Sequence, residues 1–367
     1  MTRRISSFIV IVMCLPVSNA LGSNPGSARM DAIRRAQVWT KTNVSAMDIK
    51  AGPQGEGAFA PEATVNCEWV DKKMTGRSPK FTCVIPPDDE VKVKYGPDNG
   101  EVYAEVAATR LLWALGFGAD RMYPVKVVCK GCPAEAVGTD IAAIERKMDG
   151  TEIESDIETG WAWRELDLVD PDKGGAPLAH RDALKLLAVF LQHTDSKAVQ
   201  QRLLCLDPTE KPAAGAKSDD KDKDKDKDKD KDKDKPKGDK GACKEPFMLV
   251  QDVGLTFGHA TKSNGSGTSA SFSEWSATPI WKDRDRCVGN MVKSMTGTLK
   301  NPVISEEGRK FLADLLRQLT DQQLRDLFEV ARFGRRTVPD QPAATIDQWV
   351  DAFKKKRTEI VDHVCPG

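Results

Sequence analysis

The sequence predicts an α+β protein in which a β-rich first lobe precedes a mainly helical second lobe. Two observations indicate this division. Before Gly150, short runs of apolar and β-branched residues surround a single helical pattern, and after Gly150 the apolar residues mostly recur at helical spacing. Strands grouped ahead of helices are typical of an α+β arrangement. A chain of 367 residues is long enough for one two-lobed unit or for two small domains.

The beginning of the chain is predicted to be a signal peptide over residues 1–20. Arg3 and Arg4 precede an apolar run at residues 5–17, and Ala20 supplies a small residue for cleavage. The run is too short to span a bilayer, and no later stretch is long or apolar enough. The mature chain is therefore expected to have no transmembrane segment and to be periplasmic or secreted. The paired arginines fit twin-arginine export as well as the general secretory route.

Residues 61–149 form the predicted first lobe, behind a segment at residues 21–60 that is expected to be flexible. Asp98 is the expected N-cap of the one helix, and Glu101 three residues later completes a capping box. Gly116 is the expected C-cap. Four strands are predicted around this helix: Thr64–Val70, Lys80–Ile85, Glu90–Tyr95 and Tyr123–Cys129.

Residues 150–367 form the predicted second lobe. Asp182–Gln192 is apolar nearly all round, as a buried helix is, and Phe247–Val250 is expected to be a short strand. Between them, residues 219–235 alternate Lys and Asp. In a helix this alternation places like charges four residues apart, where they repel, and in a strand it leaves no apolar face. A disordered insert is therefore expected at about residues 207–242. Amphipathic helices are predicted after it: Ser305–Leu316, Asp321–Phe333 and Ile346–Val361.

The cysteine content predicts disulfides. Of nine cysteines, Cys14 leaves with the signal peptide, and the remaining eight are an even number in an oxidising compartment. A zinc site or a redox pair at Cys129 and Cys132 (CKGC) is the alternative, although zinc usually requires further ligands and the four histidines lie far away in the sequence. Sequential pairing is the simplest expectation: Cys67 with Cys83, Cys129 with Cys132, Cys205 with Cys243, and Cys287 with Cys365.

The charge balance bears on the class of partner. Lys and Arg number 55, as do Asp and Glu, so the formal net charge is zero. A balanced charge gives no electrostatic case for nucleic acid or an anionic membrane as a partner. No nucleic-acid partner is therefore expected.

Charged residues at apolar positions are the candidates for chemistry. Lys92 and Lys94 lie two apart, so on a strand both project from one face. Glu105 shares a helical stripe with Ala108 and Leu112, and a carboxylate buried there requires a cation, which the lysines can supply. The alternatives are a solvated strand face and a first-turn glutamate favoured by the helix dipole.

Two aspartates follow apolar elements. Asp195 lies in the sequence HTDSK, directly after the most apolar helix pattern, and Asp252 lies in QDVG, directly after the FMLV strand. Gly254 and Gly258 would let the backbone approach a ligand closely. Taken singly, each aspartate is also typical of a helix or turn cap.

In chain order these pieces resemble the protein-kinase-like superfamily, which pairs a strand lysine with a helix glutamate and then has H-x-D-x-K-x-x-N and D-x-G. The resemblance implies a two-lobed fold that binds ATP or another nucleotide with Mg²⁺ or Mn²⁺. It implies that Lys94 holds the phosphates and Glu105 fixes Lys94. Asp195 would act on the acceptor hydroxyl, Lys197 on the transferred phosphate, and Asp252 on the metal.

The sequence departs from the family pattern at two places. Gln200 stands where the family has a metal-binding Asn, and it offers the same neutral oxygen one methylene further out. No G-x-G-x-x-G phosphate loop is evident: the hairpin tip at residues 74–80 has a single glycine, and the glycine-rich residues 51–59 precede the first predicted strand.

The predicted function is therefore that of an exported, atypical kinase-like protein that binds a nucleotide and transfers phosphate to a hydroxyl acceptor of unidentified class. The alternative is a catalytically inactive kinase-like binding or structural protein of the cell envelope. A hydrolase is a third interpretation, because residues 254–258 (GLTFG) resemble a nucleophile elbow with Thr256, and His259 or His363 would then be the base.

Overall fold

The computed structural model describes residues 25–155, 159–207, 243–258, 268–291, 294–338 and 343–366. The predicted signal peptide and the Lys–Asp run lie outside the described residues. The helices are α1 (Pro25–Arg35), α2 (Gly100–Ala114), α3 (Leu178–Leu191), α4 (Phe272–Ala277), α5 (Glu306–Arg317), α6 (Asp321–Val330) and α7 (Ile346–Val361). The strands are β1 (Ala63–Val70), β2 (Lys80–Ile85), β3 (Asp89–Tyr95), β4 (Arg121–Lys130), β5 (Thr139–Arg146), β6 (Thr151–Glu152), β7 (Gln201–Cys205), β8 (Pro246–Val250), β9 (Trp281–Asp283) and β10 (Val288–Gly289).

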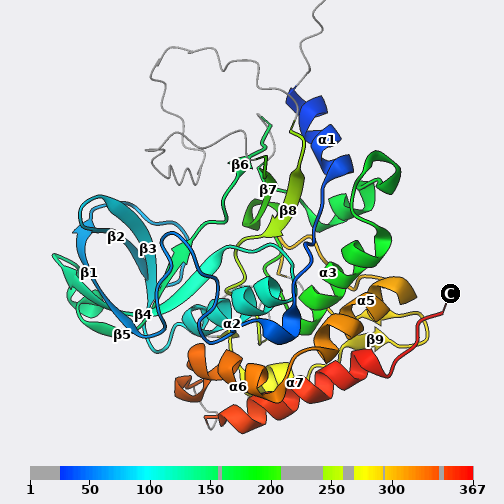
Figure 1. The fold of residues 1–367 in the computed structure, drawn as a ribbon. Helices are drawn as coiled ribbons and strands as arrows, with labels where there is room; N and C mark the ends of the chain where they lie inside the picture. Colours follow the sequence, from blue (N-terminus) through cyan, green and yellow to red (C-terminus); the bar gives the residue numbers. More distant parts are fainter. Residues whose placement is uncertain are drawn as a thin grey trace, which may run out of the picture.

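The architecture is mixed α+β, and its first large element is a closed barrel of strand order β1-β2-β3-β5-β4 (Figure 1). Neighbouring strands are antiparallel except β1 and β4, whose parallel pairing closes the barrel. Val91 and Val93 of β3 join a core shared by these strands, and the period of two turns Lys92 and Lys94 to the opposite face. The predicted strands are present, whereas β5 was not predicted because Ala142 and neighbouring small residues give it little β propensity.

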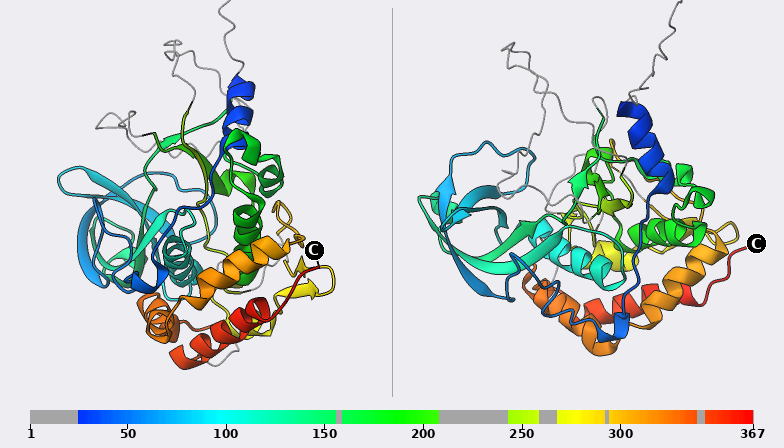
Figure 2. Two further views of the ribbon diagram at one scale, coloured as in Figure 1. Left: turned by 45° about the vertical axis from the view of Figure 1, so that its right-hand side comes forward. Right: turned by 45° about the horizontal axis from the view of Figure 1, so that its top comes forward.

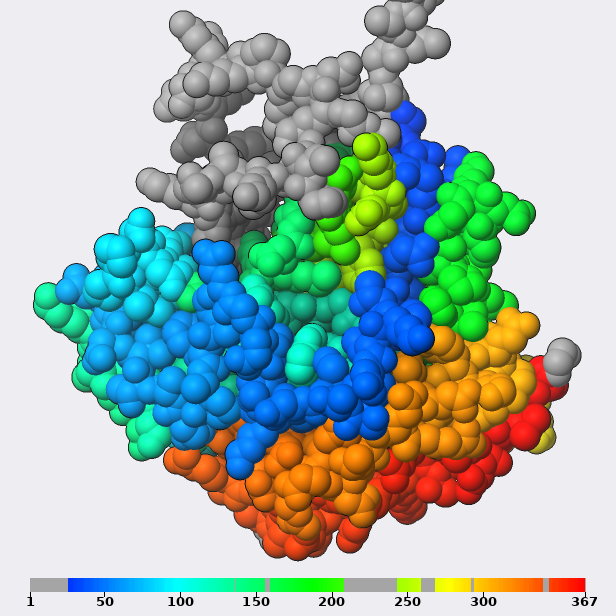
Figure 3. All heavy atoms as spheres, in the orientation of Figure 1, coloured from blue at the N-terminus to red at the C-terminus, as the bar shows by residue number. Residues whose placement is uncertain are grey.

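The described part of residues 21–60, predicted to be flexible, packs against the rest of the protein instead. Val44 and Ile49 are fully buried, and residues 37–53, here called the N-terminal strap, run across one face of the molecule from α1 toward the C-terminal helices (Figure 3). Gln323 of α6 donates hydrogen bonds to the carbonyls of Val44 and Met47. The strap has no regular spacing of apolar residues, so its sequence shows neither helix nor strand periodicity.

Helices are the main regular elements of the chain beyond the barrel (Figure 2). Helix α3 packs on α5, and α7 packs on both α5 and α6, while α2 lies between the barrel and α6 (Figure 1). The predicted helices and the strand β8 are present with small shifts at their ends. The antiparallel sheet β6-β7-β8 contains two strands that were not predicted, β6 and β7. Strand β7 was not recognised because only a single 3-10 turn, Ala198–Gln200, separates it from the HTDSK motif.

Four disulfides join the eight described cysteines in the sequential pairing that was predicted. Cys129 and Cys132 are therefore bonded to each other rather than to a zinc ion, and a redox-active pair would contain the same disulfide. Such a set of disulfides is typical of proteins in an oxidising compartment and fits an exported protein. None of the described helices has the length and apolarity needed to cross a bilayer.

One arginine joins the barrel to the helical part of the chain. Arg332, directly after α6, donates from its guanidinium to the carbonyls of Ala142 and Val125, at 2.9 and 3.0 Å. It also pairs with Glu62 at the entrance to β1. Val125 and Ala142 are neighbours across β4 and β5 next to an irregularity in their register, which leaves these carbonyls available to the side chain.

Candidate functional site

Lys94 is the centre of a buried cluster of opposite charges. Its Nζ lies 2.7 Å from Glu105 Oε1, 2.9 Å from Glu101 Oε2 and 3.7 Å from Asp252 Oδ1. The Lys94 and Glu105 side chains are only 2 and 3% exposed. Burial favours the neutral amine, but the charges of Asp252, Glu101 and Glu105 outweigh burial and raise the pKa of Lys94. The sequence-predicted pair of Lys94 and Glu105 is therefore in direct contact.

Glu101 does not have the role that the sequence predicted. The N-cap of α2 is Asn99 rather than Asp98, and the Asn99 side chain accepts a hydrogen bond from the Glu101 backbone N–H at 3.2 Å. The Glu101 carboxylate instead reaches Lys94. Helix α2 thus presents two carboxylates, four residues apart on one face, to the same ammonium group.

Asp195 and Asp252 are linked through Gln200. The Gln200 amide donates to Asp195 Oδ2 at 2.7 Å and to Asp252 Oδ2 at 3.4 Å. The Asp195 carboxylate also accepts from Ser294 Oγ at 3.1 Å and pairs with Lys197 Nζ at 3.2 Å. The two segments are further joined because the backbone N–H of Asp252 donates to the Gln200 carbonyl at 3.2 Å. The motifs that follow α3 and β8 therefore lie side by side.

The Asp252 carboxylate is strongly acidic and accessible. Burial would raise its pKa, but the Lys94 ammonium and the hydrogen bond from the Gly254 N–H outweigh burial and hold the pKa well below its usual range. The side chain is nevertheless 39% exposed. Beside it, Gln200 Oε1 is buried and has no hydrogen-bond partner within the described parts of the chain. An ionised carboxylate and an orphaned amide oxygen therefore adjoin each other.

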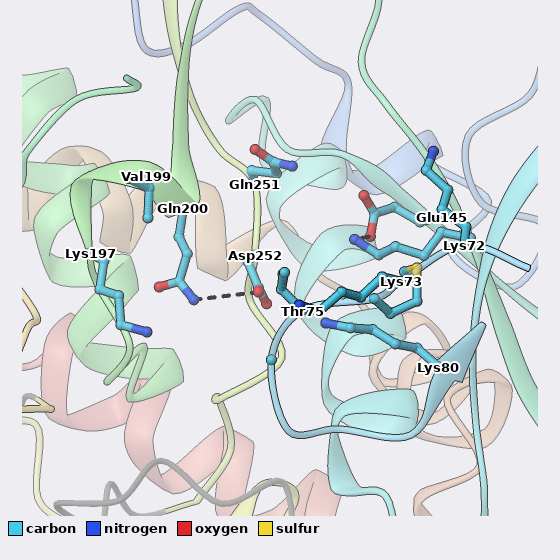
Figure 4. Close-up of a pocket in the computed structure, with 13 residues that line it drawn as sticks. Lys72, Lys73, Thr75, Lys80, Glu145, Lys197, Val199, Gln200, Gln251 and Asp252 are labelled. Atoms are coloured by element: carbon cyan, nitrogen blue, oxygen red, sulfur yellow. Dashed lines mark hydrogen bonds and ion pairs between the residues drawn. The ribbon is translucent and has the colours of Figure 1, made fainter. Parts of the chain in front are cut away.

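Asp252, Gln200 and Lys197 border a cavity of about 540 Å³ between the barrel and the segments that follow α3 and β8. Figure 4 shows Asp252 between Gln200 and Lys197 on one side and the lysines of the barrel on the other. Glu145 of β5 also lines it and pairs with Lys92 at 2.7 Å. The cavity is lined by Lys72, Lys73, Met74, Thr75, Gly76, Lys80, Lys92, Glu145, Lys197, Val199, Gln200, Gln251 and Asp252.

The lining includes residues that sequence reasoning missed. Glu145 gave no signal because the strand that carries it, β5, was not predicted. Lys80 is the first residue of a predicted strand, and its place one strand before Lys92 and Lys94 could have identified it. The connection between β1 and β2, which contains the single glycine Gly76, lies over the cavity at the position where the sequence placed a phosphate loop.

The hydrolase interpretation finds no support in the described residues. Thr256 is 1% exposed, and its hydroxyl donates to the Val253 carbonyl at 2.8 Å. His363 lies against the Cys287–Cys365 disulfide, with Nε2 3.1 Å from Cys287 Sγ. His259 lies outside the described residues. A buried hydroxyl whose proton is already donated to a carbonyl is not placed to attack a substrate.

Comparisons with known proteins assign no family. No known protein family matches the sequence, and no curated protein matches it significantly. Among solved structures, the chain is similar to the crystal structure of a Helicobacter pylori proinflammatory kinase, CtkA. The identity is 11% and the TM-score 0.40, over 82% of this chain and 96% of that chain. With identity and TM-score this low, the likeness assigns no activity to this chain.

Proposed function

We propose that this chain is an exported, two-lobed kinase-like protein that binds ATP or another nucleotide with Mg²⁺ or Mn²⁺ in the lysine-lined cavity and transfers its terminal phosphate to a hydroxyl acceptor. One observation carries the proposal. Side chains from four separate elements form a continuous chain of contacts, namely Glu105, Lys94, Asp252, Gln200 and Asp195. Two of these residues, Asp252 and Gln200, line the cavity, and charged groups held in mutual contact beside a cavity are candidates for a functional site.

The donor set fits a small divalent cation. Asp252 stays ionised at neutral pH, and the Gln200 oxygen is buried without a hydrogen-bond partner among the described residues. Mg²⁺ prefers oxygen ligands and usually takes one or two carboxylates together with substrate phosphates. Asp252 and Gln200 would hold the cation, which when bound would offset the negative charge of the phosphates. The Gln200 side chain thus replaces the Asn of the family without a change in ligand chemistry.

The remaining side chains divide between the phosphates and the acceptor. Lys94 is a permanent cation held in place by Glu101 and Glu105, and it would bind the phosphate oxygens. The Asp195 carboxylate is fixed by Ser294 and Gln200 and pairs with Lys197, which lines the cavity. It would orient the acceptor hydroxyl and accept its proton, while Lys197 would bind the transferred phosphate.

Two alanine variants test the proposal. In Asp195→Ala, we expect nucleotide binding to survive while phosphate transfer is lost, because that residue acts on the acceptor. In Asp252→Ala, both metal-dependent binding and transfer should be lost. Binding is measured as thermal stabilisation by ATP with and without Mg²⁺, which amounts to about 2.7 kcal/mol at a hundred times the dissociation constant. Transfer is measured with γ-labelled ATP as release to water or labelling of the protein itself.

Asp314→Ala is the matched control, because Asp314 is an exposed residue of α5 that pairs only with Lys310 and Arg317 among the described charges. Metal-dependent ATP binding without transfer by the unmodified protein would favour the inactive kinase-like binding protein instead. A protein whose melting temperature responds to no nucleoside triphosphate with either metal would overturn the proposal.

A further inference from the structure

Three lysines project from one face of the barrel, and two of them, Lys80 and Lys92, line the cavity. In the antiparallel pairing of β2 and β3, Lys80 is directly opposite Lys94, and Thr82 is opposite Lys92. Residues directly opposite each other on neighbouring strands project to the same face, and like charges in that arrangement destabilise the sheet. Lys80, Lys92 and Lys94 therefore form a cationic cluster that requires compensating anions.

Two of the three lysines have those anions within the protein. Lys94 pairs with Glu101 and Glu105, and Lys92 pairs with Glu145. Within the described parts of the chain, no side chain forms an ion pair or a hydrogen bond with Lys80. Burial and the charges of Lys94 and Lys92 lower the Lys80 pKa, and the more distant charges of Asp252 and Glu101 offset this only in part.

The Lys80 side chain is placed so that its charge faces the cavity. The side chain lines the cavity next to Asp252 and opposite Lys197 (Figure 4). The β1–β2 connection curls over it: Gly76 has a φ of +81°, and a Cβ added there would lie 2.9 Å from Lys80 Nζ. The ammonium thus sits beneath the connection that takes the place of a glycine-rich phosphate loop.

We propose that Lys80 binds the phosphate chain of the nucleotide, so that a side-chain ammonium replaces the backbone N–H groups of a glycine-rich loop. This inference rests on the proposed function and adds to it a ligand class: the site selects nucleotides by the number of their phosphates. The incoming phosphate supplies the anion that Lys80 lacks. Affinity should therefore rise steeply from adenosine through ADP to ATP.

The experiment compares Lys80→Met with the unmodified protein by calorimetric titration of ATP, ADP and adenosine in the presence of Mg²⁺. A charge-assisted hydrogen bond contributes about 1.5–3 kcal/mol, so we expect ATP affinity to fall about tenfold to a hundredfold. Adenosine affinity should stay unchanged. Lys80→Arg should keep most of the ATP affinity, and inorganic tripolyphosphate should compete with ATP in the unmodified protein but not in Lys80→Met.

Lys130→Met is the matched control, because Lys130 is an exposed lysine of the same barrel that pairs with Glu68 away from the cavity. Without ligand, Lys80→Met should melt no lower than the unmodified protein, because it removes a like-charge contact. If Lys80 had a merely structural role, the melting temperature of Lys80→Met would fall instead. Equal ATP affinities of Lys80→Met and the unmodified protein would overturn this inference and leave the proposed function standing. Absence of ATP binding by the unmodified protein would overturn both.

Discussion

At the scale of single residues, His193 is a buried base without a partner. It is 1% exposed, its ring lies 5.9 Å from that of Trp163, and neither ring nitrogen has a hydrogen-bond partner among the described residues. Burial lowers the pKa of His193 to about 4, although the charges of Asp252 and Asp195 act in the opposite direction. The imidazole therefore packs as a neutral ring beneath the two aspartates of the site.

This burial predicts a specific pH dependence of stability. Between the ordinary pKa of 6.5 and about 4, the unfolded chain takes up a proton at His193 that the folded chain does not, so stability falls as the pH drops through this range. In His193→Phe this contribution disappears. Relative to the unmodified protein, the variant should gain up to about 3 kcal/mol in unfolding free energy from pH 7 to pH 4. Urea unfolding at each pH measures the difference.

His363→Phe serves as the control, because His363 lies near the surface and its pKa is lowered less markedly. Parallel stability profiles of His193→Phe and the unmodified protein would contradict the assignment of His193 as a buried neutral base.

The sequence identified much of the charged site and missed the rest for definable reasons. Lys94, Glu105, Asp195 and Asp252 were found because each interrupts or follows an apolar pattern, which is visible in a single sequence. Their roles in binding and transfer stay predictions. Glu101 was misassigned because a capping box explained it locally, and only the tertiary structure brings its carboxylate to a lysine of another element.

At the scale of elements, α2 is held in place from behind by the N-terminal strap. Trp39 Nε1 donates to the Leu115 carbonyl at 2.8 Å, and Thr42 Oγ1 donates to the Ala114 carbonyl at 2.7 Å. These are the last carbonyls of the helix, which have no partner within it. The strap thus fixes the end of α2 opposite the carboxylates that hold Lys94. No local pattern could have predicted this contact, because the strap has no periodicity.

Gly116 allows a direct test of this attachment. It has a φ of +87°, and a Cβ added there would lie 2.1 Å from the Thr40 carbonyl oxygen. Gly174 has a nearly equal φ of +86° with no atom near its Cβ position. Gly174→Ala is therefore destabilised only by the cost of a positive φ at a residue with a Cβ, and by no steric clash. We expect Gly174→Ala to cost about 1 kcal/mol and Gly116→Ala about 3 kcal/mol or more, with weaker ATP binding.

Chemical denaturation and ATP titration of both variants give the comparison. If the two substitutions lowered the unfolding free energy equally, the strap would move away from the added Cβ without an energetic penalty, and it would not position α2.

At the scale of the whole molecule, a disulfide joins the two ends of the segment that contains the Lys–Asp run. Cys205 ends β7 and Cys243 precedes β8, and their disulfide holds the two Cα atoms 5.7 Å apart. The strands β7 and β8 pair directly beyond this bond. Whatever lies between the two cysteines is therefore attached to the fold by a covalently closed base, at the end of the β7-β8 pair opposite to the one that leads to Asp252.

Removal of residues 217–240, joined by a short Gly-Ser link, should therefore leave stability nearly unchanged. Loop closure depends only logarithmically on length, at about 0.6 kcal/mol per doubling, and the disulfide fixes the closure in both proteins. The unfolding free energy should change by less than about 1 kcal/mol, and ATP binding should be retained. Thermal and urea unfolding under non-reducing conditions test this; a large drop in melting temperature would show that the run contributes packing.

Arg332 has a consequence for the order in which the protein acquires its structure. The guanidinium supplies hydrogen-bond donors to two barrel carbonyls that precede it by 190 and 207 positions. During synthesis the barrel segment emerges first, and these carbonyls lack that donor until most of the chain has followed. The hydrogen bonding of these two barrel carbonyls is therefore completed only by a residue that follows all five barrel strands in the chain.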